Sequence, residues 1–101
     1  MIKKEYSKTG RSCKITLDLP ANVQARTASV CGEFNDWNQD ANPMKRRKDG
    51  TFTASFSVKP GSQYRFRYLI DGERWENDWN ADAYLPNEHG TEDSVLNVEQ
   101  A

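Results

Sequence analysis

Residues 51–70 have the sequence TFTASFSVKPGSQYRFRYLI, and this stretch decides the fold. From Thr51 to Val58, apolar side chains alternate with Thr and Ser. From Tyr64 to Ile70, residues 64, 66, 68 and 70 are apolar or aromatic and share one face, while Arg65, Arg67 and Leu69 point to the other. Successive side chains of a β-strand point to opposite faces of its sheet, so both segments are predicted to be strands with one buried face. The Pro60-Gly61 pair between them favours a turn. The stretch therefore predicts a protein built from short β-strands.

The same alternation extends towards the N-terminus. From Ser12 to Leu19, the apolar residues Cys13, Ile15, Leu17 and Leu19 share one face, which predicts a half-buried strand. Residues 1–11 either add an edge strand over Ile2–Tyr6 or form a frayed tail. Further strands are predicted at Ala28–Phe34, Met44–Lys48 and Asp93–Val98.

Two dipeptides mark sharp reversals of the chain. Asp49-Gly50 is the strongest signal for a two-residue hairpin, and Asp71-Gly72 begins a second tight turn. After residues 74–76, the segment Asn77–Thr91 is predicted to be a long loop. About six to eight short strands without a helical period predict an all-β, immunoglobulin-like sandwich over residues 12–98, with a small barrel as the alternative.

Composition limits the classes of partner. The chain has 101 residues, 29% of them charged, and a net charge of -1, which gives no electrostatic reason to bind nucleic acid or a membrane surface. No apolar run approaches the roughly 18 residues of a membrane helix, and no signal-peptide core follows the start. Cys13 and Cys31 are expected to be reduced thiols rather than a disulfide, and the chain is expected to be cytoplasmic. An exposed edge strand allows either a monomer or a weak dimer.

The three tryptophans are the most informative residues for function. Trp37 and Trp79 lie in similar stretches, residues 35–41 (NDWNQDA) and 77–83 (NDWNADA), each following a predicted strand. Each stretch is either an Asx-rich turn with a Trp anchored on the sandwich edge, or part of a shared aromatic platform that includes Trp75. Indole rings stack on sugar faces, and sugar hydroxyls bond to planar polar side chains. The three rings therefore indicate a sugar site.

Arg65 and Arg67 project from the face of their strand that is opposite the apolar face. They either supply hydrogen-bond donors beside the rings or form ion pairs with nearby acids on a solvated sheet face. The run Lys45, Arg46, Arg47, Lys48 is better explained as a solvated edge strand than as a nucleic-acid patch.

No metal or other cofactor is indicated. Asp78, Asn80 and Asp82 have the spacing of the first calcium ligands of an EF-hand, but Ala83 replaces the required glycine and His89 replaces the bidentate glutamate. One histidine and two separated cysteines do not make a zinc site. No pair of carboxylates is marked for glycoside hydrolysis, so catalysis by this chain alone is not expected.

Several motifs, in their order along the chain, resemble those of a known family. They are Gly32, Phe34, Asn35, Trp37, Met44, Asp49-Gly50, Pro60-Gly61, Tyr64-Arg65-Phe66, Asp71-Gly72, Trp75 and Gly90-Thr91. In this order they resemble carbohydrate-binding module family 48, which includes the isoamylase N-terminal (early set) domain and the glycogen-binding domain of the AMP-activated protein kinase β subunit. The resemblance covers roughly residues 12–98 and implies an immunoglobulin-like sandwich of the early set type.

The resemblance also implies roles for individual residues. It implies that Trp37 and Trp75 stack on glucose units, that Arg65 is the basic contact, and that Thr91 is a polar contact. Three departures accompany it: His89 replaces an apolar finger residue, Asp93 replaces an amide, and Glu73-Arg74 lengthens the turn before Trp75.

These observations lead to two main hypotheses. The first is a non-catalytic module that binds α-glucan or maltooligosaccharide through Trp37, Trp75 and Arg65, with Arg67, Trp79 and Asp93 as further candidates. The second is a protein-interaction or assembly module of the same fold that does not bind glycan, and its partner is a glucan-active enzyme or another protein. A glycosidase is a third and weaker hypothesis. The first hypothesis expects Trp37, Trp75 and Arg65 to meet on one exposed patch.

Overall fold

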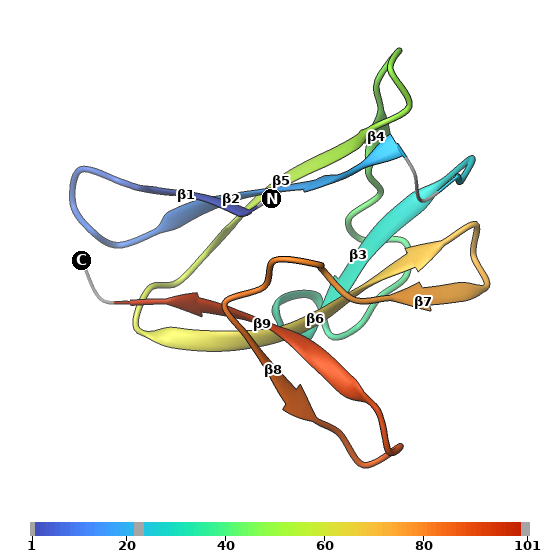
Figure 1. The fold of residues 1–101 in the computed structure, drawn as a ribbon. Coiled ribbons are helices and arrows are strands. Elements are labelled where there is room, and N and C mark those ends of the chain that lie inside the picture. The colour runs from blue at the N-terminus through green and yellow to red at the C-terminus, as the bar shows by residue number, and fades with distance from the viewer. Residues whose placement is uncertain (1, 22–23, 100–101) are drawn as a thin grey trace.

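The chain forms a β-sandwich in a computed structural model that describes residues 2–21 and 24–99. Within these ranges there are nine strands and no α-helix. The strands are β1 (Ile2–Tyr6), β2 (Cys13–Leu19), β3 (Ala28–Gly32), β4 (Lys45–Arg46), β5 (Phe52–Val58), β6 (Ser62–Ile70), β7 (Arg74–Glu76), β8 (Ala83–Pro86) and β9 (Glu92–Val98). They form two separate antiparallel sheets facing each other (Figure 1), which confirms the predicted immunoglobulin-like sandwich.

The two sheets have simple strand orders. The first is β1-β2-β5-β4, so residues 2–6 form an edge strand paired with β2. The second is β3-β6-β9-β8, and β7 pairs with the end of β6. β6 is the longest strand and contacts β3, β7 and β9. Three of the strands that carry the candidate site therefore pair with β6, and β8 pairs with β9.

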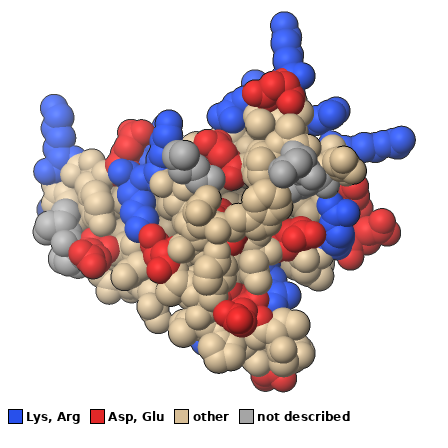
Figure 2. Space-filling model, viewed as in Figure 1, with Lys and Arg blue, Asp and Glu red and all other residues tan. Residues whose placement is uncertain are grey.

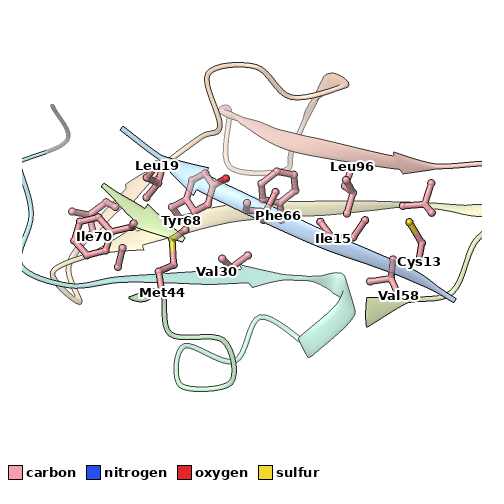
Figure 3. Close-up of a cluster of buried hydrophobic side chains, with 14 residues drawn as sticks. Cys13, Ile15, Leu19, Val30, Met44, Val58, Phe66, Tyr68, Ile70 and Leu96 are labelled. Atoms are coloured by element: carbon pink, nitrogen blue, oxygen red, sulfur yellow. The ribbon is translucent and has the colours of Figure 1, made fainter. Parts of the chain in front are cut away.

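The core lies between the sheets and follows the predicted alternation (Figure 3). In β2, the side chains of Cys13, Ile15 and Leu17 are fully buried. They belong to one apolar cluster with Phe66 and Tyr68 of β6. Burying such side chains stabilises the fold by about 1.5–3 kcal/mol each. This shared core fixes β6 against the opposite sheet.

The strand predicted from Ala28 to Phe34 is wrong at its end. β3 stops at Gly32, and Glu33–Asn35 form a single 3₁₀ turn. Asn35 Oδ1 accepts the N–H of Gly32 at 3.0 Å, so the side chain replaces a strand partner and turns the backbone. The Phe34 ring still packs inward, stacked on Phe56 with the ring centroids 4.3 Å apart.

The predicted long loop from Asn77 to Thr91 is also wrong, because β8 lies within it and forms a hairpin with β9. The four residues of β8 are exposed or half-buried and end in a proline. Such a short edge strand has no buried face, so it lacks the apolar alternation from which strands are predicted. β7 has only three residues, so it is also too short to show an apolar alternation.

The Asp49-Gly50 hairpin has a different turn from the one predicted. The N–H of Gly50 bonds to the carbonyl of Arg47 at 3.0 Å, and only Gly50 of the pair has positive φ. A two-residue type I′ loop requires positive φ at both positions, so this is a longer connection. At Asp71-Gly72, by contrast, both residues have positive φ and the tight turn is confirmed.

Candidate functional site

The turn after β3 displays Trp37. Asn35 holds this turn to the strand, because its Nδ2 donates to the Val30 carbonyl at 2.9 Å. Asp36 and Trp37 then adopt the left-handed conformation, with φ of 56° and 59°, and the Trp37 N–H bonds to the Gly32 carbonyl at 2.8 Å. This conformation is uncommon for a bulky residue and is found where the surroundings impose it, often at functional sites. Here it projects an indole that is 37% exposed.

Trp75 is displayed by the β6–β7 hairpin. It pairs with Leu69 across the ladder, and its ring is 41% exposed. The hairpin is tied to the neighbouring loop, since the Asp71 carboxylate accepts the N–H groups of Arg26 and Thr27 at 2.8 and 3.0 Å. These two hydrogen bonds lower the pKa of Asp71, because they favour the charged carboxylate. The hairpin that carries Trp75 is therefore held against the loop at Arg26 and Thr27.

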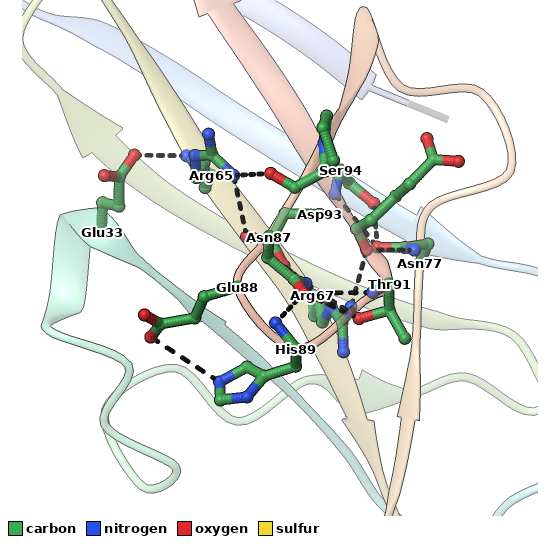
Figure 4. A network of polar contacts seen from close by, with 12 residues as sticks. Glu33, Arg65, Arg67, Asn77, Asn87, Glu88, His89, Thr91, Asp93 and Ser94 are labelled. Carbon is green, nitrogen blue, oxygen red and sulfur yellow. Dashed lines mark hydrogen bonds and ion pairs between the residues drawn. The ribbon is translucent and has the colours of Figure 1, made fainter.

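A network of polar contacts is built around Asp93 of β9 (Figure 4). Arg65 Nη1 donates to Asp93 Oδ2 at 3.3 Å, and Arg67 Nε lies 3.0 Å from Asp93 Oδ1. Asn87 Nδ2 also donates to Oδ1 at 3.1 Å. Asp93 is only 7% exposed, so a buried carboxylate is compensated by two arginines. The predicted ion pairing of both arginines with a nearby acid is thus present.

The arginines also bind the backbone around them. Arg65 Nη1 donates to the Pro86 carbonyl at 3.1 Å, and its own N–H donates to Glu33 Oε1 at 2.7 Å. Arg67 Nη2 donates to Thr91 Oγ1 at 2.5 Å and to the Glu92 carbonyl at 2.7 Å. Both side chains therefore lock the β8–β9 hairpin onto β6.

The tip of the β8–β9 hairpin, residues 87–91, forms one wall of the site. Asn87 Oδ1 accepts the N–H groups of His89 and Thr91 at 2.9 and 3.2 Å. These bonds fold the tip into an Asx turn. The side chains of Glu88 and His89 project from it and are 88% and 80% exposed, with His89 Nε2 lying 3.9 Å from Glu88 Oε1 (Figure 4).

These segments enclose an open depression of about 940 Å³. The structure brings together Trp37, Arg65 and Trp75 there, as the sugar-binding hypothesis expects, along with Arg67, Thr91 and Asp93. The remaining lining residues are Glu33, Gln39, Pro86, Asn87, Glu88 and His89. Trp79 does not line this depression. It lies at a smaller, adjoining depression.

Several lining residues were not foreseen from the sequence. Glu33 and Gln39 enter through the turn around Trp37, and Asn87 enters through the hairpin tip. Asn87 has a readable signal, since Asn followed three residues later by Gly90 favours a turn between two strands. Glu33 has none, because its position depends on where β3 ends.

The two similar Asn-Asp-Trp stretches are both Asx-rich turns. Asn77 resembles Asn35 in using its side chain on a strand backbone, here the N–H of Ser94 at 3.0 Å. Their aspartates differ: Asp36 has positive φ, whereas Asp78 is buried and accepts the Tyr68 hydroxyl at 2.6 Å. The two turns thus share their local chemistry and differ in their packing.

Two further features concern other kinds of site. The basic run at residues 45–48 is exposed, and Arg47 forms an ion pair with Asp18 at 3.3 Å. Across residues 2–21 and 24–99, no group of three or more His, Cys, Asp or Glu side chains is arranged to hold a metal ion. The same residues include no helix long and apolar enough to cross a membrane.

Comparison with known proteins places this geometry in a family. Residues 7–101 match the family model described as the glycogen recognition site of AMP-activated protein kinase. A comparison with curated proteins found no match. The family match covers nearly the whole chain, and it agrees with the sandwich fold. The chain therefore belongs to the family of carbohydrate-binding modules typified by the glycogen recognition site of AMP-activated protein kinase.

Proposed function

We propose that this chain is a non-catalytic module that binds α-glucan, in the form of glycogen, starch-like chains or maltooligosaccharide. The observation that carries the proposal is the meeting of Trp37, Trp75 and Arg65 at one open depression of about 940 Å³. The family match supports the same class of ligand. Both residues are partly exposed, Trp37 at 37% and Trp75 at 41%. Exposed, rigidly held indoles suit the apolar faces of glucose units.

The polar groups of the depression suit a neutral ligand. Its two arginines are compensated by Asp93, and Glu33 and Glu88 add further negative charge. Elsewhere, on the face drawn in Figure 2, Lys and Arg are interspersed with Asp and Glu. A polyanion finds no excess of positive charge at this site. Sugar hydroxyls, in contrast, can bond to uncharged and compensated groups alike.

Arg65 keeps donors for those hydroxyls. Among the described residues, its side-chain contacts with Pro86 and Asp93 both use Nη1. A guanidinium carries five N–H donors, so Nε and Nη2 remain available to a ligand. At the hairpin tip, the Thr91 hydroxyl and the Asn87 amide bond to each other and to Arg67 and Asp93, so they shape the wall of the depression.

The acids of the depression do not favour catalysis. Asp93 is held by two arginines and Glu33 accepts the Arg65 N–H, while Glu88 projects from the hairpin tip. Glycoside hydrolysis needs two carboxylates poised on either side of the scissile bond.

The buried, free thiols of Cys13 and Cys31 are compatible with a reducing compartment, and we include a cytoplasmic location in the proposal.

Titration with maltoheptaose or β-cyclodextrin tests the proposal, followed by tryptophan fluorescence and calorimetry. Trp37→Ala and Trp75→Ala are expected to abolish measurable binding, and Arg65→Ala to weaken it by about tenfold, because a charged hydrogen bond is lost. Arg65→Lys retains part of the affinity. Tyr6→Ala is the matched control, since Tyr6 is an exposed aromatic on β1 of the other sheet. An absence of response by the wild type at millimolar ligand contradicts the proposal and favours an assembly module instead.

A further inference from the structure

A second depression, of about 300 Å³, adjoins the first. It is lined by Arg67, Trp75, Glu76, Asn77, Trp79 and Thr91. Arg67, Trp75 and Thr91 line both depressions, so the two are neighbours. Trp79, the most exposed of the three tryptophans at 58%, lines only the second.

The backbone that bears Trp79 is fixed by the residues before it. Asn77 Oδ1 accepts the Ser94 N–H at 3.0 Å, and its Nδ2 donates to the Glu92 carbonyl at 2.8 Å. Asp78 is 3% exposed and accepts the Tyr68 hydroxyl at 2.6 Å. An exposed ring on a fixed backbone loses little conformational freedom when it stacks on a ligand.

The exit from the turn is fixed as well. Asp78 Oδ1 accepts the N–H of Asn80 at 2.7 Å, and the Tyr84 hydroxyl donates to the Asp78 carbonyl at 2.6 Å. Trp79 therefore lies between two anchored residues, while its side chain stays in solvent. Among the described residues, nothing in the core accounts for an indole at this position, since Trp79 is absent from the apolar cluster and its partly buried neighbours.

The groups around Trp79 repeat the chemistry of the first depression. An indole again stands beside an arginine, an amide and a carboxylate, here Arg67, Asn77 and Glu76. Arg67 is paired with Asp93 and Glu76 with Arg74, so both charges are compensated, which favours a neutral ligand with hydroxyls.

We propose that Trp79 and Trp75 form a second subsite that receives further glucose units of the same α-glucan chain. This inference rests on the proposed function, because the second depression is reached through Trp75. A ligand that spans both depressions contacts one more aromatic ring than a short one. Affinity therefore rises with glucan chain length, and Trp79 supplies the gain.

Calorimetry of maltotriose and maltoheptaose tests the inference on the wild type and on Trp79→Ala. Wild type is expected to bind maltoheptaose about two- to tenfold more tightly than maltotriose, as one additional stacking contact predicts. Trp79→Ala loses this gain and keeps the wild-type affinity for maltotriose. Tyr6→Ala, which removes an exposed ring from β1 of the other sheet, is the control and keeps the gain.

Fluorine NMR of the wild type labelled with 5-fluorotryptophan observes each ring separately. The Trp79 resonance, assigned by its loss in Trp79→Ala, is expected to shift with maltoheptaose and to stay in place with maltotriose. Unchanged maltoheptaose affinity in Trp79→Ala overturns the inference and leaves the proposed function intact. Failure of the wild type to bind either sugar overturns both.

Discussion

At the scale of single residues, Gly32 controls where Trp37 points. Its carbonyl accepts the Trp37 N–H at 2.8 Å, and its own N–H is held by Asn35. A Cβ at this position lies 2.5 Å from the Arg65 carbonyl oxygen and 2.8 Å from Phe66 Cβ. Its φ of -170° is open to any residue, so space alone requires glycine. Gly32 therefore sets the approach of the Trp37 turn to β6.

Gly32→Ala is expected to destabilise the protein by about 1–3 kcal/mol, because backbone atoms of two segments must move apart. The shift also displaces Trp37, so glucan affinity should fall. Urea unfolding measures the first effect and calorimetry the second. Ala54→Gly offers a comparison on β5, where the change removes a methyl group and causes no clash. Wild-type stability in Gly32→Ala contradicts this account of the turn.

At the scale of elements, the segment from Asn77 to Asp82 is attached to β6 and β9 by buried polar contacts. The Tyr68 hydroxyl donates to Asp78 Oδ2 at 2.6 Å, and Ser94 Oγ accepts the Asp78 N–H at 2.8 Å. Both Tyr68 and Asp78 are almost fully buried. Burial, followed by the nearby Asp78 charge, raises the pKa of Tyr68 well above its usual value. The neutral phenol is therefore the form that the fold requires.

Tyr68→Phe is expected to cost about 1–3 kcal/mol of stability, since a buried carboxylate oxygen of Asp78 loses its partner. Tyr84→Phe is the matched control, because Tyr84 also bonds to Asp78 but is 40% exposed and should cost less. Denaturant unfolding at neutral pH measures both. Equal losses of unfolding free energy in the two variants would show that burial of the Tyr68 hydrogen bond does not increase its contribution to stability.

The same contact predicts a loss of stability at alkaline pH. Above about pH 10 the unfolded state loses the tyrosine proton, whereas the folded state keeps it because the folded pKa of Tyr68 is higher. The unfolded state then binds fewer protons, so stability falls as pH rises above that point. The slope of unfolding free energy against pH should be shallower in Tyr68→Phe than in the wild type. Parallel slopes contradict the assignment.

At the scale of the whole molecule, both cysteines are closed off from solvent, Cys13 within the core cluster and Cys31 outside it. Cys13 and Cys31 are free and fully buried, as their reading as reduced thiols predicts. Burial raises the pKa of each thiol, because it disfavours the thiolate. The thiolate is the reactive form, so both groups should be inert while the sandwich is intact.

Ellman's reagent at pH 8 is expected to react with neither cysteine in the folded protein, apart from slow reaction through transient unfolding. In denaturant, both thiols should react rapidly. The absorbance of the released thiolate measures the number and rate. Rapid reaction of either thiol in native buffer contradicts the burial of that cysteine.

Much of the fold follows from local pattern. The alternation of residues 51–58 and 64–70 and of Cys13 to Leu19 predicted three strands whose apolar face is buried or half-buried. Such strands are predictable because a buried face imposes a period of two on the sequence. β7 and β8 could not be predicted in this way, since their exposed positions impose no period.

The candidate site was likewise only partly predictable from the sequence. The sequence by itself determined which residues could bind a sugar, because exposed tryptophans on Asx turns and outward arginines are recognisable as residue types. Only the tertiary structure decided that Trp37, Trp75 and Arg65 share one depression and that Trp79 lies at the next. It also decided that Asp93 holds both arginines, a contact between residues 28 positions apart for Arg65. The physical reason is that β6 pairs on one side with β3 and on the other with β7 and β9, and pairing between distant strands brings together side chains that no local pattern relates.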